Sequence, residues 1–411
     1  MATLQPFRAL RPKSTDAARR IAAVPYDVVS TDEARALARD NALSFLHVSR
    51  AEIDLPPSTD PYADAVYDRA AANFASLRRD SLTVENEPGV YFYRLRMGNH
   101  TQTGLAACFS LDEYDRDIIR KHERTRRDKE DDRTRHMIAL GAQTGPVFLT
   151  YRAAPDVDAV AARVAGCEPL FDFEADDRVG HTIWRVGGAD CDALVAAFKR
   201  IPSLYIADGH HRAASAARAR AEMRARGLPG TSLGDGADAS TMLAVAFPHD
   251  QVQILPYNRT VKDLGGLSRD AFVKAVGERF NMQPGPATPG RRGEIAMYFD
   301  KQWQTLTPRA RPNASDPIGS LDVSVLQDQL LAPILNITDV RTDKRIDFVG
   351  GARGTGELER LVDSGKAAVA FSLYPVSVAD LMAVSDAGAI MPPKSTWFEP
   401  KLRDGLLIHA I

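Results

Sequence analysis

Cysteine is scarce in this sequence, and the few cysteines are too far apart to share a chemical site. Cys108, Cys167 and Cys191 are the three cysteines among 411 residues, and no two of them form a CxxC pair. An odd number of separated cysteines indicates neither a disulfide framework nor a thiolate metal site. We therefore expect all three to be small core residues.

Long apolar runs are missing as well. No stretch of 18 consecutive apolar residues occurs, and the start MATLQPFRALRP has no basic region followed by an apolar core. These absences support neither membrane spanning nor export, so we expect a cytoplasmic protein with no membrane partner.

The chain also has no large excess of charge of either sign. The chain has 52 basic and 54 acidic residues, and its formal net charge is −2. This balance gives no general attraction to a polyanion, so we expect no nucleic-acid partner, and any nucleotide binding must come from a local patch. The length allows two or three core-forming units of an ordinary globular protein.

Strand-like and helix-like segments alternate along the chain, which predicts an α/β fold with α+β character. Helices are expected at TDEARALARDN, with Thr31 as N-cap, and at DPYADAVYDRAAANFASLRRDS. Strands are expected at SFLHV and GVYFYRLRM. Further α/β units are expected near the end, through RIDFVGG, GELERLVDSG, AAVAFSLYPV and SVADLMAVSDAG. The Gly-rich stretches GTSLGDGADAST and MQPGPATPGRRG are candidate seams or surface loops.

A dense polar stretch lies between the apolar SLYIA and the Ala-rich RAASAARARAEMRAR, which predicts a strand, a turn and a helix. Gly209 allows a tight backbone path, and the first N–H groups of the helix suit a phosphate or carboxylate. Arg212 adds a bidentate grip, and His210 and His211 add hydrogen-bond donors. Asp208 is a candidate Mg²⁺ ligand and proton acceptor.

The alternative for this stretch is structural: Asp208 caps the helix, and the histidines pack or face solvent. Contiguous groups suited to anion, metal and proton chemistry at a helix start favour phosphate binding over this alternative. A metal site made of His210 and His211 alone is disfavoured, because adjacent residues there point in different directions.

The same residues carry a resemblance. ADGHHRAA resembles the Gly-X-X-Arg phosphate-binding motif of the ParB/sulfiredoxin-like fold, and DGHHR is similar to the form found in the free-serine kinases of that fold. Nearly the whole chain also resembles a bacterial and archaeal family catalogued as a domain of unknown function. That resemblance rests on VPYDVVS, SFLHVSRAEIDLP, HERTRRDKEDDRTRH, YIADGHHRAA, LPYNRTV and MPPKSTWFEPKL.

The kinase resemblance implies transfer of the terminal phosphoryl group of ATP or ADP to the hydroxyl of a small molecule, with Mg²⁺ as cofactor. Free L-serine is the first substrate that it implies. Asp208 would then lie near the metal and the attacking hydroxyl. The implied phosphate-binding residues are Gly209, His210, His211 and Arg212.

Two features of the resembling proteins have no aligned counterpart here. The serine kinases use a catalytic glutamate from an early segment, for which Glu52 and Glu123 are both candidates. Sulfiredoxins have a catalytic cysteine where this chain has His210, which disfavours sulfinic-acid reduction.

The second dense stretch runs from Arg116 to Arg135, with nine basic and six acidic residues. His122, Glu123, Lys129 and Asp132 are expected to line a polyphosphate and Mg²⁺ cleft: Glu123 as a catalytic residue, His122 and Lys129 as phosphate ligands. The alternative is a solvated helix with i,i+4 ion pairs.

The third dense stretch, MPPKSTWFEPKL, gives Lys394, Ser395 and Thr396 as ligands for a carboxylate, phosphate or amino-acid substrate. Its alternative is a rigid connection in which Trp397 and Phe398 fill the core.

Two Pro-Tyr segments, VPYDVVS and LPYNRTV, also need partners for their polar groups. They make Tyr26 and Asp27 candidate substrate-binding residues, and Tyr257 and Asn258 candidate cleft residues, with turn capping as the alternative.

Together these features predict a ParB/sulfiredoxin-like core within an α/β region at 1–262, and a C-terminal α/β region at 263–411 contributing to the same cleft. The predicted function is a nucleotide-dependent small-molecule kinase. The alternatives are a ParB-like nucleotide-binding regulatory protein and a metal-dependent hydrolase using Asp208, His210 and His211.

Overall fold

The computed structural model describes residues 1–227, 238–310, 312–313 and 315–411, which form two compact units. Unit 1 comprises Met1–Val252 and Pro400–Ile411, and unit 2 comprises Gln253–Glu399. This division differs from the expected region 263–411, since the C-terminal segment belongs to unit 1. The reason is backbone pairing: Ala23 pairs with Asp404, and Leu10 with Ile408. No described helix is both long and apolar enough to cross a membrane.

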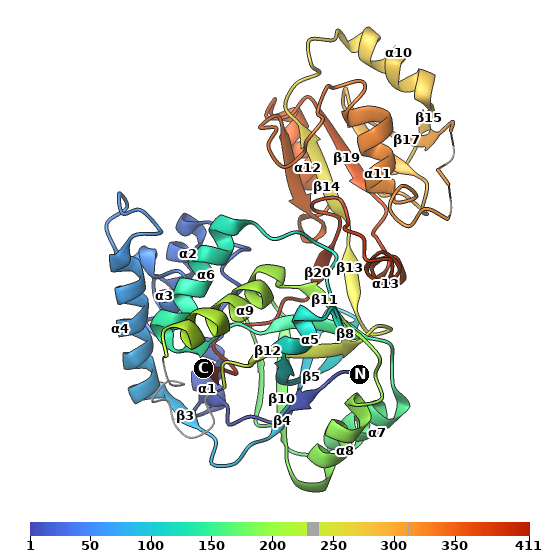
Figure 1. Ribbon diagram of the computed structural model, residues 1–411. Helices are drawn as coiled ribbons and strands as arrows, with labels where there is room; N and C mark the ends of the chain where they lie inside the picture. The colour runs from blue at the N-terminus through green and yellow to red at the C-terminus, as the bar shows by residue number, and fades with distance from the viewer. Residues whose placement is uncertain (228–237, 311, 314) are drawn as a thin grey trace. The chain divides into compact units, whose positions relative to one another are not determined.

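A nine-stranded mixed sheet lies at the centre of unit 1 (Figure 1). Its strands in spatial order are β6 (Ile119–Arg120), β11 (Leu204–Asp208), β8 (Val147–Tyr151), β12 (Thr241–Pro248), β5 (His100–Ser110), β4 (Val90–Met97), β10 (Gly180–Val186) and β9 (Phe171–Glu174), with β1 (Leu4–Gln5) beside β5. β11 is parallel to β6 and antiparallel to β8. Two smaller pairs join β2 (Leu10–Pro12) to β3 (Leu82–Val84), and β7 (Ala142–Gln143) to β21 (His409–Ala410).

The helices of unit 1 are α1 (Thr15–Ile21), α2 (Thr31–Ala38), α3 (Leu46–Ser49), η1 (Ala51–Asp54), α4 (Asp64–Ser81), α5 (Leu111–Asp115), α6 (Arg127–Leu140), α7 (Pro155–Val164), α8 (Gly188–Phe198) and α9 (His210–Ala225). Leu204 and Ile206, alternate residues of β11, share one hydrophobic core with apolar residues of α7, α8 and α9. Because alternate strand residues face the same side, these three helices cover one face of the sheet. Figure 1 shows α4, α6 and α9 side by side.

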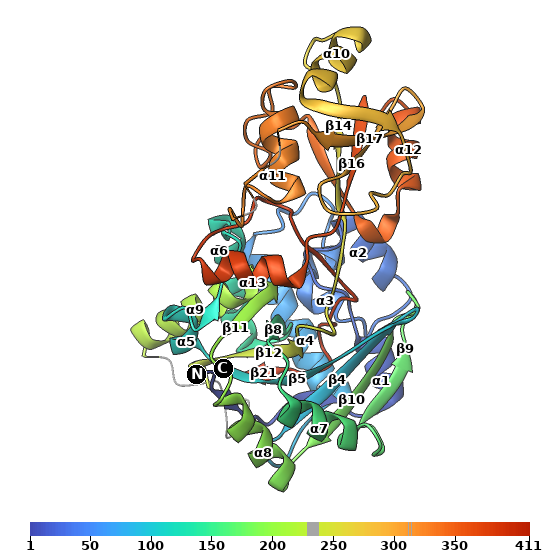
Figure 2. The ribbon, with the colours of Figure 1, turned by 90° about the vertical axis from the view of Figure 1, so that its right-hand side faces the viewer.

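Unit 2 is built on a six-stranded sheet. Its order is β15 (Phe280–Pro284), β17 (Gln302–Pro308), β16 (Ile295–Phe299), β19 (Val369–Leu373), β14 (Tyr257–Val261) and β18 (Ile346–Gly350). The first and last strands of the unit, β13 (Gln253–Leu255) and β20 (Trp397–Glu399), pair with each other. Its helices are α10 (Arg269–Arg279), α11 (Asp322–Leu326), η2 (Gln327–Leu331), η3 (Gly351–Arg353), α12 (Gly356–Asp363) and α13 (Val378–Asp386), and α12 packs on β14, β16 and β19 (Figure 2).

The predicted mixed α/β class is confirmed, and so are most of the predicted elements. SLYIA is β11, GVYFYRLRM is β4, and the four segments near the end are β18, α12, β19 and α13. MQPGPATPGRRG begins inside β15 and continues as the loop to β16 of the same sheet, so it is not a seam. Most of GTSLGDGADAST lies outside the described residues.

Three local predictions are wrong. SFLHV, expected as a strand, enters helix α3, because a short apolar run fits a strand or a buried helix equally, and here α3 packs on α4. Thr31 is the first residue of α2, and Ser30 caps that helix in a capping box with Glu33. Cys108 and Cys191 are buried as expected, whereas Cys167 is exposed beyond the end of α7.

Candidate active site

The DGHHR turn connects β11 to α9 in unit 1. Gly209 has φ of +90° and is the N-cap of α9, and no side chain caps this helix. The carboxylate of Asp208 accepts a hydrogen bond from the Gly209 N–H at 2.9 Å. Asp208 therefore binds the backbone just before the helix, and the first N–H groups of α9 keep their capacity to bind an anion.

Asp208 is held in its charged form by cations. Lys401 Nζ donates to Asp208 Oδ2 at 3.1 Å, and Arg212 Nη2 lies 3.7 Å from the same oxygen. Burial acts to raise the pKa of Asp208, but Lys401 and Arg212 outweigh burial, so this pKa lies well below its usual range. Sequence reasoning missed Lys401, although it belongs to the quoted stretch MPPKSTWFEPKL.

Arg212 lies beneath the turn and is only 5% exposed. Its Nη1 donates to the carbonyl of Pro146. A Cβ atom at Gly209 would lie 2.8 Å from Arg212 Nε, so the absence of a side chain at Gly209 makes room for the guanidinium. This burial and the bond to Pro146 show that Arg212 positions the turn, and its expected grip on phosphate stays a prediction.

Residues 121–126 fold over the start of α9. The backbone N–H of His122 donates to His210 Nε2 at 3.4 Å, and the N–H of Arg126 donates to His211 Nε2 at 3.0 Å. Both imidazoles therefore accept hydrogen bonds at Nε2, where the sequence suggested donors. Burial lowers the pKa of His210 and that of His211, so both rings are neutral at pH 7 and carry their proton on Nδ1.

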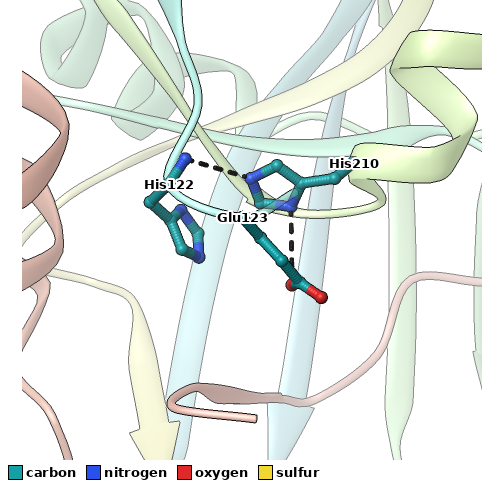
Figure 3. A group of neighbouring side chains, drawn as sticks. All are labelled: His122, Glu123 and His210. Carbon is teal, nitrogen blue, oxygen red and sulfur yellow. Dashed lines mark hydrogen bonds and ion pairs between the residues drawn. The ribbon is translucent and has the colours of Figure 1, made fainter. Parts of the chain in front are cut away.

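Glu123 comes to the turn on this folded-over segment. Its Oε2 lies 3.9 Å from Nδ1 of His210, as Figure 3 shows, and its side chain is 43% exposed. Glu52, the other candidate glutamate, is 7% exposed and pairs with Arg50 at 2.7 Å. Of the two, the structure brings Glu123 to the DGHHR turn.

His122 is buried against His210, with ring centroids 4.4 Å apart and the planes perpendicular. Neither ring nitrogen of His122 makes a hydrogen bond of ordinary geometry within the described chain, and burial lowers its pKa to about 4. Ligand atoms of His122, Glu123 and His210 lie within 4.8 Å of one another. This trio suits a transition metal better than Mg²⁺, which prefers oxygen ligands.

The remaining candidates of the charged stretch face elsewhere. Lys129 donates to the Tyr62 hydroxyl at 2.9 Å, and Asp132 accepts from the Tyr67 hydroxyl at 2.8 Å. Both residues line a cavity that does not include His122 or Glu123 among its lining residues. The expected common cleft for all these side chains is therefore not formed around the turn.

Tyr26 and Asp27 lie in unit 1 with the turn. Tyr26 is buried, and the Arg133 guanidinium stacks on its ring at 4.3 Å. Asp27 is exposed, and its charge opposes the lowering of the pKa of His211 by burial. Their role in substrate binding stays a prediction.

Lys394, Ser395 and Thr396 belong to unit 2, where the first two bond to their neighbours. Arg259 donates to the Lys394 carbonyl at 3.0 Å, and Ser395 Oγ donates to the Pro392 carbonyl at 2.6 Å. Their substrate role also stays a prediction.

The flanking aromatics of unit 2 are packed. Phe398 is 1% exposed, and Trp397 packs edge-on against Tyr257 at 5.1 Å. Tyr257 and Asn258 are both buried within β14. These contacts match the rigid connection that was the alternative for MPPKSTWFEPKL.

Residues 4–324 match the family described as "Protein of unknown function (DUF1015)". The chain belongs to this family. That confirms the whole-chain resemblance to a domain of unknown function, and it assigns no activity.

Solved structures give weak likenesses to this DUF1015 chain. A free serine kinase in complex with AMP is 13% identical, with 73% of this chain and 92% of that one covered and a TM-score of 0.36. SbnI with a C-terminal truncation, from Staphylococcus aureus, is 12% identical, with 73% and 85% covered and a TM-score of 0.39. A conserved hypothetical protein from Pyrococcus furiosus is 12% identical, with 74% and 94% covered and a TM-score of 0.35. A search of curated proteins finds no match.

Proposed function

We propose that this DUF1015 protein is a nucleotide-dependent kinase that phosphorylates the hydroxyl of a small molecule, with free L-serine as the first acceptor to test. The observation that carries the proposal is the position of the Glu123 carboxylate beside the uncapped start of α9 and its DGHHR turn. A base, an anion site and the ionised Asp208 are then within one small region. The resemblance of DGHHR to the free-serine kinases supplies the reaction type.

Phosphate binding is assigned to the backbone of the turn. The first N–H groups of α9 and the positive end of its macrodipole favour the negative charge of a nucleotide phosphate. Asp208 fits a Mg²⁺ ligand, because it is ionised and its side chain is 27% exposed. Mg²⁺ bound there would neutralise phosphate charge during transfer.

Glu123 is assigned as the general base. It accepts the proton of the acceptor hydroxyl while that oxygen forms a bond to the terminal phosphorus of the nucleotide. The bond between this phosphorus and the bridging oxygen breaks, so the nucleotide leaves with one phosphate fewer. His210, whose Nδ1 faces Glu123, is a positioning residue for the carboxylate.

The proposal is tested by incubating the protein with Mg²⁺, L-serine and either ATP or ADP and measuring O-phosphoserine by phosphorus NMR. We expect product with the wild type and at least a hundredfold lower rate with Asp208→Asn. Asp16→Asn, at an exposed residue of α1, is the matched control and should retain the wild-type rate. Absence of product with both nucleotides would overturn the serine kinase assignment.

A metal-dependent hydrolase is the second candidate, and it is favoured by the trio His122, Glu123 and His210. The specific observation is that the ring nitrogens of His122 make no hydrogen bond of ordinary geometry within the described chain. One Mn²⁺ or Zn²⁺ retained per chain after dialysis without nucleotide, together with hydrolysis of a phosphoester, would support this function instead. This trio replaces the predicted set of Asp208, His210 and His211.

A further inference from the structure

A cavity of about 190 Å³ lies in unit 1 among α3, η1, α4 and α6. Pockets for drug-sized ligands are about 300–1,000 Å³. The cavity is therefore too small for a nucleotide and has the size for a metabolite of a few heavy atoms.

One wall of the cavity is a single face of α6. Lys129, Asp132, Arg133 and His136 follow the i, i+3, i+4, i+7 spacing of one helix face, and all four line the cavity. Three of them are fixed by protein partners. Asp132 accepts from Tyr67 and pairs with Arg133, and His136 Nε2 lies 2.9 Å from the Val48 carbonyl. These contacts make the wall rigid.

Three polar groups of the cavity keep unused hydrogen-bonding capacity within the described chain. Glu52 Oε1 accepts hydrogen bonds from Arg50 Nε at 2.7 Å and from Thr31 Oγ1 at 3.4 Å. Glu52 Oε2 therefore keeps its capacity to accept a hydrogen bond from a ligand. Lys129 Nζ donates one hydrogen to the Tyr62 hydroxyl and has two more.

The third group is the hydroxyl of Ser49, a residue that is 3% exposed. Its Oγ has no hydrogen-bond partner among the described residues. An unsatisfied buried hydroxyl destabilises the folded chain, so a ligand that bonds to it is favoured. Ser49, Glu52 and Lys129 all line the same small space.

We propose that this cavity binds a small zwitterionic amino acid. The α-ammonium group pairs with Glu52, the α-carboxylate pairs with Lys129, and Ser49 Oγ adds a hydrogen bond. The rings of Tyr26, Tyr62 and Tyr67 line the space around the side chain of the ligand. A neutral metabolite offers no charge to either Glu52 or Lys129, and an ion of a single charge offers one to only one of them, which sets the specificity.

The test is calorimetric titration of the full chain without nucleotide. L-alanine is the probe, because it has both charges but no hydroxyl to accept a phosphoryl group, so the result does not depend on kinase activity. Ethanolamine lacks the carboxylate, and lactate lacks the ammonium. We expect one L-alanine per chain and at least tenfold weaker binding of the other two.

Variants locate the binding. Lys129→Met and Glu52→Gln should each weaken L-alanine binding at least tenfold, since each removes a charged hydrogen bond. Matched controls are Lys13→Met, which removes an exposed lysine bonded to carbonyls, and Glu85→Gln, which removes a carboxylate paired with Arg11. Both controls should bind as the wild type does.

Glu52→Gln also removes the ion pair with Arg50 and could impair folding, which thermal unfolding would reveal. In that case Lys129→Met alone decides the test. Absence of L-alanine binding at millimolar concentration, or binding unchanged in Lys129→Met, would overturn the proposal. Binding of ethanolamine and lactate as tight as that of L-alanine would overturn it as well.

Discussion

The DGHHR turn of unit 1 and the Lys394–Thr396 segment of unit 2 are equally dense in polar residues, but they differ in what meets there. The turn gathers Asp208, Glu123 and Lys401 from three separate parts of the chain. At the unit 2 segment, Ser395 bonds to a carbonyl three residues away, and Arg259, which comes from a distant strand, donates to the backbone carbonyl of Lys394. The difference teaches that convergence of distant charged side chains distinguishes the turn better than polar density along the sequence does.

Gly209→Ala should break the turn and have the largest effect. An alanine at φ of +90° is strained, and its Cβ would lie 2.8 Å from Arg212 Nε. We expect a loss of about 1–3 kcal/mol in the free energy of unfolding, measured in urea, together with loss of nucleotide binding. Gly98→Ala, at φ of +57° with nothing within 4 Å of the new Cβ, is the control for backbone strain alone. Equal effects of the two changes would contradict this account of the turn.

Lys401→Met tests how much the C-terminal segment contributes to keeping Asp208 ionised, apart from the contribution of the turn itself. Without Lys401, burial of Asp208 is less well opposed, so the pKa of Asp208 rises. The acidic limb of the pH–rate profile should then move to higher pH, because a larger fraction of Asp208 is protonated at a given acidic pH. Lys401→Arg keeps the charge and should restore most of the profile. An unmoved acidic limb in Lys401→Met would show that this lysine does not set the charge of Asp208.

Lys394→Met tests whether the Lys394–Thr396 segment of unit 2 contributes to substrate binding. If the predicted substrate role of the unit 2 segment is right, KM for the acceptor should rise about tenfold while kcat is unchanged, because a charged hydrogen bond to the ground state is lost. Steady-state kinetics over a range of acceptor concentration gives both parameters. Unchanged KM and kcat would leave this segment with a structural role only.

Asp404→Asn should have the smallest effect on activity, because its effect is confined to stability. Burial raises the pKa of Asp404 to about 7, so between about pH 4 and pH 7 the folded chain holds a proton that the unfolded chain releases. Wild-type stability therefore falls as pH rises through this window, by at most about 1.4 kcal/mol per pH unit. Asparagine does not titrate, so the variant gains stability relative to the wild type from pH 5 to pH 7 and no more above that.

Asp208→Asn provides the contrast to Asp404→Asn when the free energy of unfolding in urea is measured over the same pH range. The pKa of Asp208 lies well below its usual range, so Asp208 stays ionised from pH 5 to pH 8 in both the folded and the unfolded chain. The difference between wild type and Asp208→Asn should therefore not vary with pH in this window. A difference that grows with pH would contradict the charge assigned to Asp208.

The strand, turn and helix around Asp208 could be predicted from sequence, because apolar content, helix propensity and a glycine between them are local signals. The position of Glu123 beside the turn could not, since it depends on residues 121–126 folding onto α9. The contact of Lys401 with Asp208 depends on the return of the C-terminal segment to unit 1, which leaves no periodic signal. SFLHV failed as a strand because tertiary packing decided its conformation.

The most direct test of the central claim is the rate of phosphoryl transfer to L-serine by Glu123→Gln, with nucleotide affinity measured on the same preparation. Glutamine keeps the size and polarity of the side chain but cannot accept the hydroxyl proton. The account predicts a rate about 10² to 10⁴ times lower than wild type with unchanged nucleotide binding. A wild-type rate in this variant would contradict the assignment of Glu123 as the base of a kinase.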